Sequence, residues 1–441
     1  MPETRPNVLL VCTDQQFADA VGARCSDLET PAMDRIAADG IRFERAYCTQ
    51  PKCTPSRASM LTGRMPHALA REDEAPIPDS IRDETLGQLF REAGYHCGFG
   101  GKWHLGGGMA IPRDEEYGHG FERVAGFDDT ALADGCIEFL REDREDPFLL
   151  LANFDNPHNI CEWARNETLP WGPVEEVPTA DCPNLPANFP IPPFEPDAVK
   201  LRARDNSPMQ QASDEEWRQY RHAYYRLIER VDREVGRILG ALAETGHAEN
   251  TIVVFTSDHG DGHGAHKLQQ KWTLYEESAR VPFILRGPGI ESGIESDALV
   301  STGLDLLPTL CEYADIVPPD GIRGHSVRPI AAGDEPGDWR KYVVTQTDKT
   351  GGRMIRTDRY KYNAYKWRRP REQLFDMAED QGEMVNLAVE SAHKHVLEAH
   401  REHLLEWCIE TDDLYREHYA HPGIPSIPGL SPAEVRAAMD E

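Results

Sequence analysis

Short apolar runs alternate with amphipathic stretches along most of the chain, and this alternation is the feature that most limits how the chain can fold. Strands that alternate with helices pair as a mostly parallel sheet, and the helices pack on its two faces. We therefore predict an α/β fold built on a large, doubly wound sheet. The runs with strand character are residues 7–13, 95–99, 148–154, 251–256 and 282–285.

The clearest helix signal lies in the middle of the chain. Ser213 and Glu216 have the spacing of a capping box, in which each side chain satisfies a backbone amide at the start of a helix. Gly246 is typical of a helix end. These signals predict one long helix that continues to about Glu244. Its apolar stripe consists of Leu227, Val231, Val235, Ile238 and Leu242.

The last part of the chain has a different pattern, in which short strand-like runs follow one another directly. This pattern predicts a smaller C-terminal antiparallel sheet followed by a helix. We expect a large domain over residues 1–335 and a small α+β subdomain over residues 336–441. The predicted strands are 342–346, 353–356, 360–365 and 372–376, and the predicted helix is 393–407.

Composition excludes several kinds of partner. The formal net charge is −29, whereas binding to nucleic acid needs a basic face, so we expect no nucleic-acid partner. No apolar run reaches the roughly 18 residues that span a bilayer, so we expect no membrane partner. The N-terminus lacks the basic and apolar regions of a signal peptide, which predicts a cytoplasmic protein. The sequence leaves the oligomeric state open.

The cysteines do not form a Cys-x-x-Cys pair, which argues against a zinc ribbon or a thioredoxin-like site. In a reducing compartment most of them should be small buried side chains. Cys12, Cys97 and Cys136 lie inside apolar stretches and fit this expectation.

Four of the predicted strands lead into polar segments. In open α/β sheets, ligands bind beyond the carboxyl ends of the strands, so these segments should meet at one site. A single polar segment would be ordinary loop chemistry, but four of them at one edge indicate a functional site. In chain order the segments contain Asp14 and Gln15, Lys102 and His104, Asp155 to His158, and Asp258 and His259.

Asp14 and Asp258 place the strongest demand on this site. Each directly follows an apolar strand, where an unpaired charge is costly, and two converging carboxylates repel each other. A divalent metal between them resolves both problems, and Gln15 and His259 are the neighbours expected to complete its ligands. The alternative is that each aspartate caps the turn that follows it.

Two other ligand motifs fail on their spacing. Gly100-Gly101-Lys102 lacks the residues of a phosphate-binding P-loop around it. His259, His263 and His266 are interrupted by glycines, so they do not share the helix face of a zinc motif. The glycines more plausibly let the backbone approach the metal site closely.

A short motif, Cys53-Thr54-Pro55-Ser56-Arg57, adds a reactive residue. Proline favours the first helical position, so a helix is expected to start near Pro55. Arg57 then lies one turn from Cys53 and can hold a nucleophile and an anionic oxygen together, helped by the helix N-terminus. On its own the motif also fits a buried cysteine before a short helix.

Together with two further segments, Gly101-Lys-Trp-His-Leu-Gly106 and the stretch 275–283, this motif resembles the type I sulfatases. These are formylglycine-dependent enzymes of the alkaline-phosphatase-like superfamily. The resemblance runs from Asp14 to about Leu387 and implies that residues 1–335 are a catalytic domain. It also implies a sulfatase that hydrolyses a sulfate monoester of a sulfated small molecule or oligosaccharide, either a carbohydrate or an aryl sulfate.

By the same resemblance, a formylglycine-generating or sulfatase-maturing enzyme oxidises Cys53 to formylglycine, whose hydrate is the nucleophile. Arg57 and Lys102 would hold the sulfate, while Asp258 would help to ionise the hydrate. His158 and Lys271 would assist the leaving alcohol. His104 would take a proton from the second hydroxyl. The implied metal ligands are Asp14, Gln15, Cys53, Asp258 and His259.

The metal ligands depart from the commonest sulfatase pattern, which has Asp-Asp at the first position and often Asp-Asn at the second. Here the pairs are Asp14-Gln15 and Asp258-His259. The family implies calcium, but an imidazole ligand suits borderline metals, so manganese is the alternative.

Two alternative functions stay open. A phosphonate monoester or phosphodiester hydrolase of the same superfamily shares the Cys-x-Pro-Ser-Arg motif and often an Asp-Gln plus Asp-His metal set. The other alternative is a non-catalytic protein with an unmodified Cys53 that binds sulfated ligands.

Overall fold

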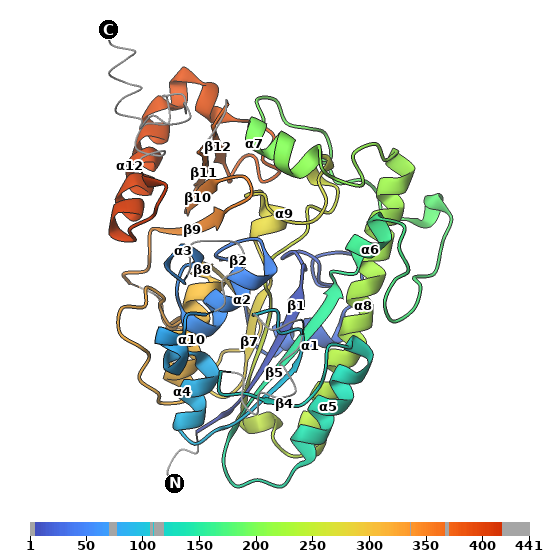
Figure 1. The fold of residues 1–441 in the computed structure, drawn as a ribbon, viewed down its shortest axis with the longest axis vertical. Helices are drawn as coiled ribbons and strands as arrows, with labels where there is room; N and C mark the ends of the chain where they lie inside the picture. The colour runs from blue at the N-terminus through green and yellow to red at the C-terminus, as the bar shows by residue number, and fades with distance from the viewer. Residues whose placement is uncertain are drawn as a thin grey trace.

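A large twisted sheet runs through the middle of the molecule, as Figure 1 shows. This computed structural model describes residues 5–69, 77–105, 109, 119–335, 337–366 and 370–416. The strands of the sheet are β1 (Asn7–Asp14), β2 (Ile41–Tyr47), β3 (His96–Gly101), β4 (Glu122–Arg123), β5 (Phe148–Pro157), β6 (Thr251–Ser257), β7 (Phe283–Arg286) and β8 (Ile294–Ser301). Over these described ranges their spatial order is β4-β3-β5-β1-β6-β7-β2-β8. Only β7 runs antiparallel to its neighbours, so the mostly parallel α/β sheet is confirmed.

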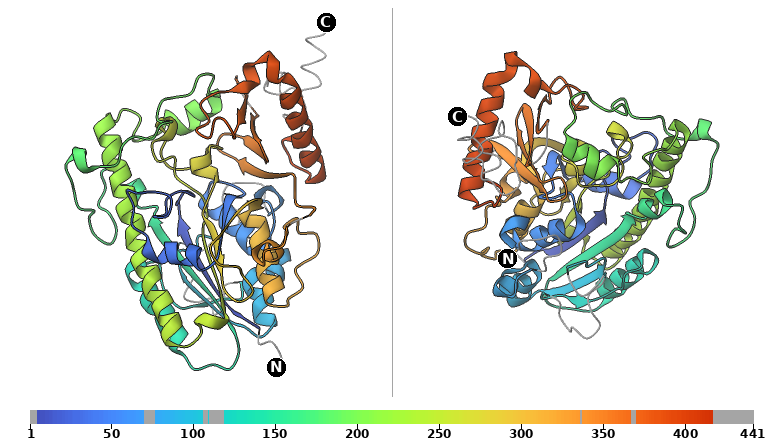
Figure 2. Two further views of the ribbon diagram at one scale, coloured as in Figure 1. Left: turned by 180° about the vertical axis from the view of Figure 1, so that it is seen from behind. Right: turned by 45° about the horizontal axis from the view of Figure 1, so that its top comes forward.

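Helices cover both faces of this sheet because alternate residues of each strand point to opposite sides. Val8 and Leu10 of β1 belong to one core, and Leu9 and Val11 belong to the other. Figures 1 and 2 show the helices on the two sides. The core that contains Leu9 includes α1 (Pro31–Ala38), α5 (Asp129–Arg141) and α8 (Asp214–Glu244), and the other includes α2 (Cys53–Thr62), α4 (Leu86–Glu92) and α10 (Thr302–Tyr313).

The predicted long helix is confirmed as α8, including its capping box. Ser213 Oγ accepts the backbone N–H of Glu216 at 3.2 Å, and Glu216 Oε2 accepts the backbone N–H of Ser213 at 2.7 Å. The helix ends at Glu244, and Gly246 follows with a φ of 76°. All five residues of the predicted apolar stripe are buried.

Three strands of the large sheet, β2, β4 and β8, were not apparent from the sequence. Arg42 and Glu44 interrupt the apolar pattern of β2, and the first half of β8 is partly exposed. Arg42 pairs with two carboxylates, because its side chain lies 2.6 Å from Glu44 of the same strand and 2.8 Å from Glu295 of β8. The pairing lets a charged segment remain in the sheet.

The register of the parallel strands brings their polar ends together. Thr13 of β1 pairs with Ser257 of β6, so Asp14 and Asp258 emerge side by side. Gly101 of β3 pairs with Asn153 of β5, which places the segment containing Lys102 beside the end of β5. The predicted convergence of four polar segments at one edge is confirmed.

A second, antiparallel sheet lies near the carboxyl ends of the large sheet, and Figures 1 and 2 show it at the top of the molecule. Its order is β12-β11-β10-β9. One face packs on the larger sheet's loops through Met354 and Phe375, which join a core with Tyr275. Ile355 and Leu374 instead join a core with the C-terminal helix. The elements are β9 (Tyr342–Thr347), β10 (Gly352–Thr357), β11 (Tyr360–Tyr365), β12 (Glu372–Asp376) and α12 (Lys394–Glu410).

Short helices complete the described structure. All ten cysteines are free, and Cys12, Cys97 and Cys136 are buried as expected. Among the described residues no helix combines the length and apolar character needed to cross a bilayer. The short helices are α3 (Pro66–Leu69), α6 (Ile160–Ala164), α7 (Asp197–Val199), α9 (Glu276–Ala279) and α11 (Arg328–Ala331).

A buried ion pair should stabilise the attachment of α12 to the small sheet. Arg353 Nε of β10 lies 2.6 Å from Asp413 Oδ2, just beyond α12, and both side chains are fully buried. Arg353→Ala leaves a buried carboxylate without its cation, so we expect a loss of about 3–5 kcal/mol in the free energy of unfolding. Urea unfolding measures this loss.

The matched control is Arg323→Ala. Arg323 also pairs with a carboxylate near the end of α12, Glu410, but both side chains are about half exposed. An exposed pair contributes at most about 1 kcal/mol. Equal losses for the two variants would contradict a structural role of the buried pair.

Candidate active site

Cys53, the first residue of the sequence motif, is also the first residue of α2. It lies beside Asp14 and Asp258 at the carboxyl ends of β1 and β6. The helix therefore begins two residues before Pro55, which agrees with the expected start near this proline. Arg57 still follows Cys53 by one turn, and both side chains are buried. Gly63 ends the helix in the left-handed conformation, with a φ of 65°.

Four potential metal ligands meet beside the start of α2. One ligand atom from each of Asp14, Cys53, Asp258 and His259 lies within 4.8 Å of the others, and all four residues are buried. Cys53 Sγ lies 3.7 Å from Asp14 Oδ1 and 3.4 Å from His259 Nε2. Two carboxylates, an imidazole and a sulfur form a donor set that fits a divalent cation.

Two cationic side chains, Arg57 of α2 and Lys102 after β3, contact the carboxylates of the cluster. Arg57 Nε lies 2.8 Å from Asp258 Oδ2, and its terminal nitrogen lies 3.2 Å from Asp14 Oδ2. Lys102 Nζ lies 2.7 Å from Asp14 and 2.8 Å from Asp155. In this geometry Arg57 and Lys102 neutralise and orient the ligand carboxylates. The sequence placed Asp155 in the third polar segment without giving it this role.

Lys271 lies on the other side of Cys53, with its Nζ 2.8 Å from Sγ and 3.3 Å from His259 Nε2. Burial and Asp14 raise the pKa of the Cys53 thiol, but Lys271, Lys102 and His259 outweigh them and hold it well below its usual value. Burial lowers the pKa of Lys271, but Cys53 and Asp14 raise it above its usual value. The site therefore favours a negative charge at position 53 and an ammonium at Lys271.

The two cluster carboxylates differ in acidity. Burial and the charge of Asp14 raise the pKa of Asp258 to about 6, although His259 and Arg57 oppose the shift. Burial also raises the pKa of Asp14, but Lys102 outweighs it and the pKa lies well below the usual range. Asp258 is therefore the more basic carboxylate of the pair.

Two histidines complete the set of residues expected from the sequence. Burial, with smaller contributions from Lys102 and Lys271, lowers the pKa of His158 to about 4, so this imidazole is neutral near pH 7. His104 is half-buried, and its Nδ1 has no hydrogen-bond partner within the described residues. An imidazole with an unpaired nitrogen is available to accept or donate a proton.

Gln15 is held at the cluster by a residue that the sequence did not single out. Its Nε2 donates to Asp261 Oδ2 at 2.7 Å, and its backbone N–H donates to Asp258 Oδ1 at 3.2 Å. Asp261 also accepts from the hydroxyl of Tyr220 at 2.9 Å. The carboxylate of Asp261 thus takes the amide N–H group of Gln15, and the amide oxygen lies 3.7 Å from Cys161 Sγ.

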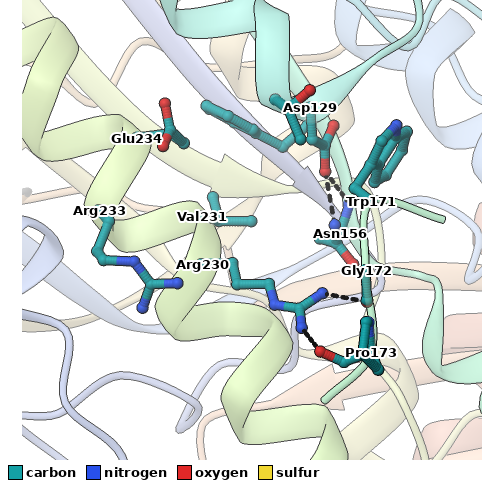
Figure 3. Close-up of a pocket in the computed structure, with 11 residues that line it drawn as sticks. Asp129, Asn156, Trp171, Gly172, Pro173, Arg230, Val231, Arg233 and Glu234 are labelled. Atoms are coloured by element: carbon teal, nitrogen blue, oxygen red, sulfur yellow. Dashed lines mark hydrogen bonds between the residues drawn. The ribbon is translucent and has the colours of Figure 1, made fainter. Parts of the chain in front are cut away.

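Asp129 anchors the end of β5, and the sequence gave no signal for this role. Its carboxylate accepts the backbone N–H groups of Asp155 and Asn156 at 2.8 Å each, and Nδ2 of Asn156 at 2.9 Å. Figure 3 shows Asn156 directed at Asp129 beside a pocket that Arg230 also lines. The contact fixes Asp155, the partner of Lys102, and the turn that carries His158.

Comparison with known proteins gives a consistent result. A family model described as sulfatase matches residues 6–316, and a model described as N-sulphoglucosamine sulphohydrolase, C-terminal, matches residues 264–410. A Delta 4,5-hexuronate-2-O-sulfatase of Bacteroides thetaiotaomicron is 32% identical and is covered over 97% of its length by 98% of this chain. An arylsulfatase of Clostridium perfringens is 28% identical, with 91% of this chain and 94% of the relative covered.

Solved structures agree with the sequence relatives. A 2-O GAG sulfatase superposes with a TM-score of 0.82 at 30% identity, covering 93% of this chain and 94% of the other. The phosphonate monoester hydrolase of Agrobacterium radiobacter has a TM-score of 0.74 at 22% identity over 92% of this chain and 96% of its own, which shows a common fold alone. Because the sulfatase matches span nearly the whole of both chains, this chain belongs to the sulfatase family of the alkaline-phosphatase-like superfamily and is a sulfuric ester hydrolase.

Proposed function

We propose that this enzyme hydrolyses a sulfate monoester of a carbohydrate, with Cys53 converted to formylglycine and a divalent cation at the cluster beside it. The observation that carries the proposal is the position of Cys53 Sγ. It lies at the N-terminus of α2, among the buried ligand atoms of Asp14, Asp258 and His259 and 2.8 Å from Lys271 Nζ. A nucleophile at this position contacts the ammonium group of Lys271 and, in this proposal, the divalent cation at the cluster.

The carbohydrate assignment is supported by the relatives. The Delta 4,5-hexuronate-2-O-sulfatase matches over nearly the full length of both chains, and an N-acetylglucosamine-6-O-sulfatase of Bacteroides thetaiotaomicron is 27% identical over 76% of this chain. The alternative of an aryl sulfate is represented by the Clostridium arylsulfatase.

Conversion of Cys53 requires a modifying enzyme that acts on the unfolded polypeptide. Cys53 is only 4% exposed and its sulfur contacts three buried residues, so the folded site gives a modifying enzyme no access to it. A formylglycine-generating or sulfatase-maturing enzyme must therefore reach the 53–57 motif before the domain closes. The modification supplies two hydroxyl groups on one carbon in its hydrated form, one to attack sulfur and one to release sulfate afterwards.

The metal ligands in this proposal are Asp14, Asp258 and His259, the modified Cys53, and the amide oxygen of Gln15. Calcium is the default ion, and manganese is the alternative that the imidazole ligand favours. The ion supplies positive charge that stabilises the negative charge on the transferred sulfate.

The side chains of the site divide the remaining work between them. Arg57 and Lys102 hold the carboxylates of Asp14 and Asp258 in place and add positive field at the sulfate. Asp258 lies within the same buried cluster as Cys53, so its carboxylate is placed to help ionise the attacking hydroxyl. Lys271 keeps its ammonium next to position 53 and stabilises the departing oxygen.

The two histidines act at different stages. His158 is neutral near pH 7, so it contributes a hydrogen bond to the leaving oxygen while Lys271 carries the charge. Within the part of the chain that the structure describes, His104 Nδ1 has no hydrogen-bond partner, so this imidazole is suited to take the proton of the second hydroxyl, which allows sulfate to leave.

The first prediction concerns the nucleophile. Cys53→Ala removes the only group that can be converted, so kcat on an aryl sulfate should fall at least about 1000-fold while the melting temperature changes little. Steady-state kinetics and a thermal melt measure the two effects. Cys25→Ala, at a half-buried cysteine that the mechanism does not use, is the control and should keep wild-type kcat. Retained turnover in Cys53→Ala would favour another nucleophile.

The second prediction concerns the metal. Asp14→Asn and Asp258→Asn should each lose the bound ion in elemental analysis and lose at least about 100-fold in kcat, because a ligand charge is removed. The control Asp134→Asn lies on the exposed side of α5 and should retain both. A metal-free protein with full activity would contradict the proposed cluster.

The third prediction concerns the reaction type. The Asp-Gln and Asp-His metal set fits a phosphonate hydrolase, whereas Lys102 and His104 belong to the segment 101–106 that resembles the sulfatases, and this segment favours sulfate. We expect kcat/KM for an aryl sulfate to exceed that for the matched aryl phosphonate monoester by at least about tenfold. The reverse preference would favour the phosphonate alternative.

A further inference from the structure

A pocket of about 250 Å³ lies beside the site, between the loop that leads into α2 and the turn between β9 and β10. Its walls therefore come both from the active-site loops of the large sheet and from the small C-terminal sheet. Its lining residues are Gln50, Pro51, Lys52, Trp272, Thr347, Asp348 and Lys349.

Two residues that line the pocket are chain neighbours of residues in the active site. Lys52 directly precedes Cys53, and Trp272 directly follows Lys271, whose Nζ contacts Cys53 Sγ at 2.8 Å. The backbone N–H of Trp272 donates to the carbonyl of Pro51 at 3.2 Å, which ties the two walls together. A substrate whose departing oxygen sits at Lys271 has the rest of its leaving group next to this pocket.

The charge of the pocket is opposite to that of the whole protein. Lys52 and Lys349 supply two positive charges and Asp348 one negative charge, so the lining carries a net positive charge in a protein of formal charge −29. Lys349 Nζ lies over the ring of Trp272, 3.3 Å from its centroid. A cation held on an aromatic face keeps its charge and its position, so it can meet an anion with little loss of side-chain freedom.

The turn that carries Lys349 is tied to the catalytic loop. The backbone N–H of Gln346 donates to the carbonyl of Thr49 at 2.8 Å, and Gln50 Nε2 donates to Asp348 Oδ2 at 2.6 Å. The hydroxyl of Thr350 donates to the carbonyl of Trp272 at 3.4 Å. These contacts hold the position of Lys349 relative to Cys53, as selective recognition requires.

We propose that this pocket is the leaving-group subsite, and that Lys349, positioned by Trp272 and assisted by Lys52, binds a second anionic group on the sugar that carries the scissile sulfate. The substrate class is thus an acidic sugar sulfate, in which the second group is a carboxylate or another sulfate. The inference rests on the proposed function, since it concerns the same reaction at the same site.

The test begins with substrate pairs that differ in one group. One pair is a hexuronate sulfate and the hexose sulfate with the same sulfated position, which replaces the carboxylate by a hydroxymethyl group. The other pair is a disulfated and a monosulfated hexosamine. We expect kcat/KM to be at least about tenfold higher for the acidic member of one pair, and that pair identifies the second anion.

Variants at Lys349 then assign the preference to the pocket. Lys349→Ala should lower kcat/KM for the preferred acidic sugar about tenfold or more, mainly through KM, and by less than about twofold for its neutral or monosulfated counterpart. Lys349→Arg should restore most of the loss because it retains the charge. Lys394→Ala, at an exposed lysine at the start of α12, removes the same charge elsewhere and should leave both values unchanged.

Turnover of 4-nitrophenyl sulfate by the wild-type enzyme separates this inference from the proposed function. An enzyme that cleaves the aryl ester but shows no preference in either sugar pair overturns the subsite alone. The subsite is also overturned if Lys349→Ala lowers kcat/KM equally for both members of a pair. Absence of any sulfate ester cleavage by protein with converted Cys53 would instead contradict the proposed function.

Discussion

Buried charge at the carboxyl edge of the large sheet is the constraint on which the rest of this structure depends. Asp14, Asp258 and Asp155 are all buried there, and an unpaired buried carboxylate costs several kcal/mol. Arg57 and Lys102 offset this cost through direct contacts, and Lys271 adds a third positive charge on the side of Cys53. The cations that stabilise the buried carboxylates in the folded protein also create a positive electrostatic field that attracts an anionic substrate.

The supporting structure places these charges with little freedom. The pairing of β1 with β6 sets Asp14 beside Asp258, and α2 brings Cys53 and Arg57 to them from one face of the sheet. From the opposite face, Asp129 at the start of α5 fixes the end of β5. Preorganised charges of this kind stabilise a developing negative charge without the cost of reorganisation. The β9–β10 turn of the small sheet lines one side of the pocket next to the loop that leads into α2.

Much of this could be predicted because local patterns dominate it. The alternating strands and helices indicated the sheet, and the capping box at Ser213 located α8 to within a residue. Strand β2 escaped prediction because its Arg42 is paired in part with Glu295, a partner far away in the sequence. The roles of Asp129 and Asp261 were likewise invisible, because each depends on backbone amides and side chains that only the tertiary fold assembles. The contacts of Arg57 with the carboxylates of Asp14 and Asp258 also required the three-dimensional arrangement.

In the proposed mechanism, position 53 reacts as an aldehyde hydrate and not as a thiol. The most direct measurement is the mass of the peptide that contains Cys53, from protein produced together with a sulfatase-maturing enzyme and assayed in the same preparation. We predict a mass about 18 Da below that of the cysteine peptide, and a specific activity that rises in proportion to the converted fraction. Full activity in protein whose Cys53 peptide retains the thiol mass would contradict the account.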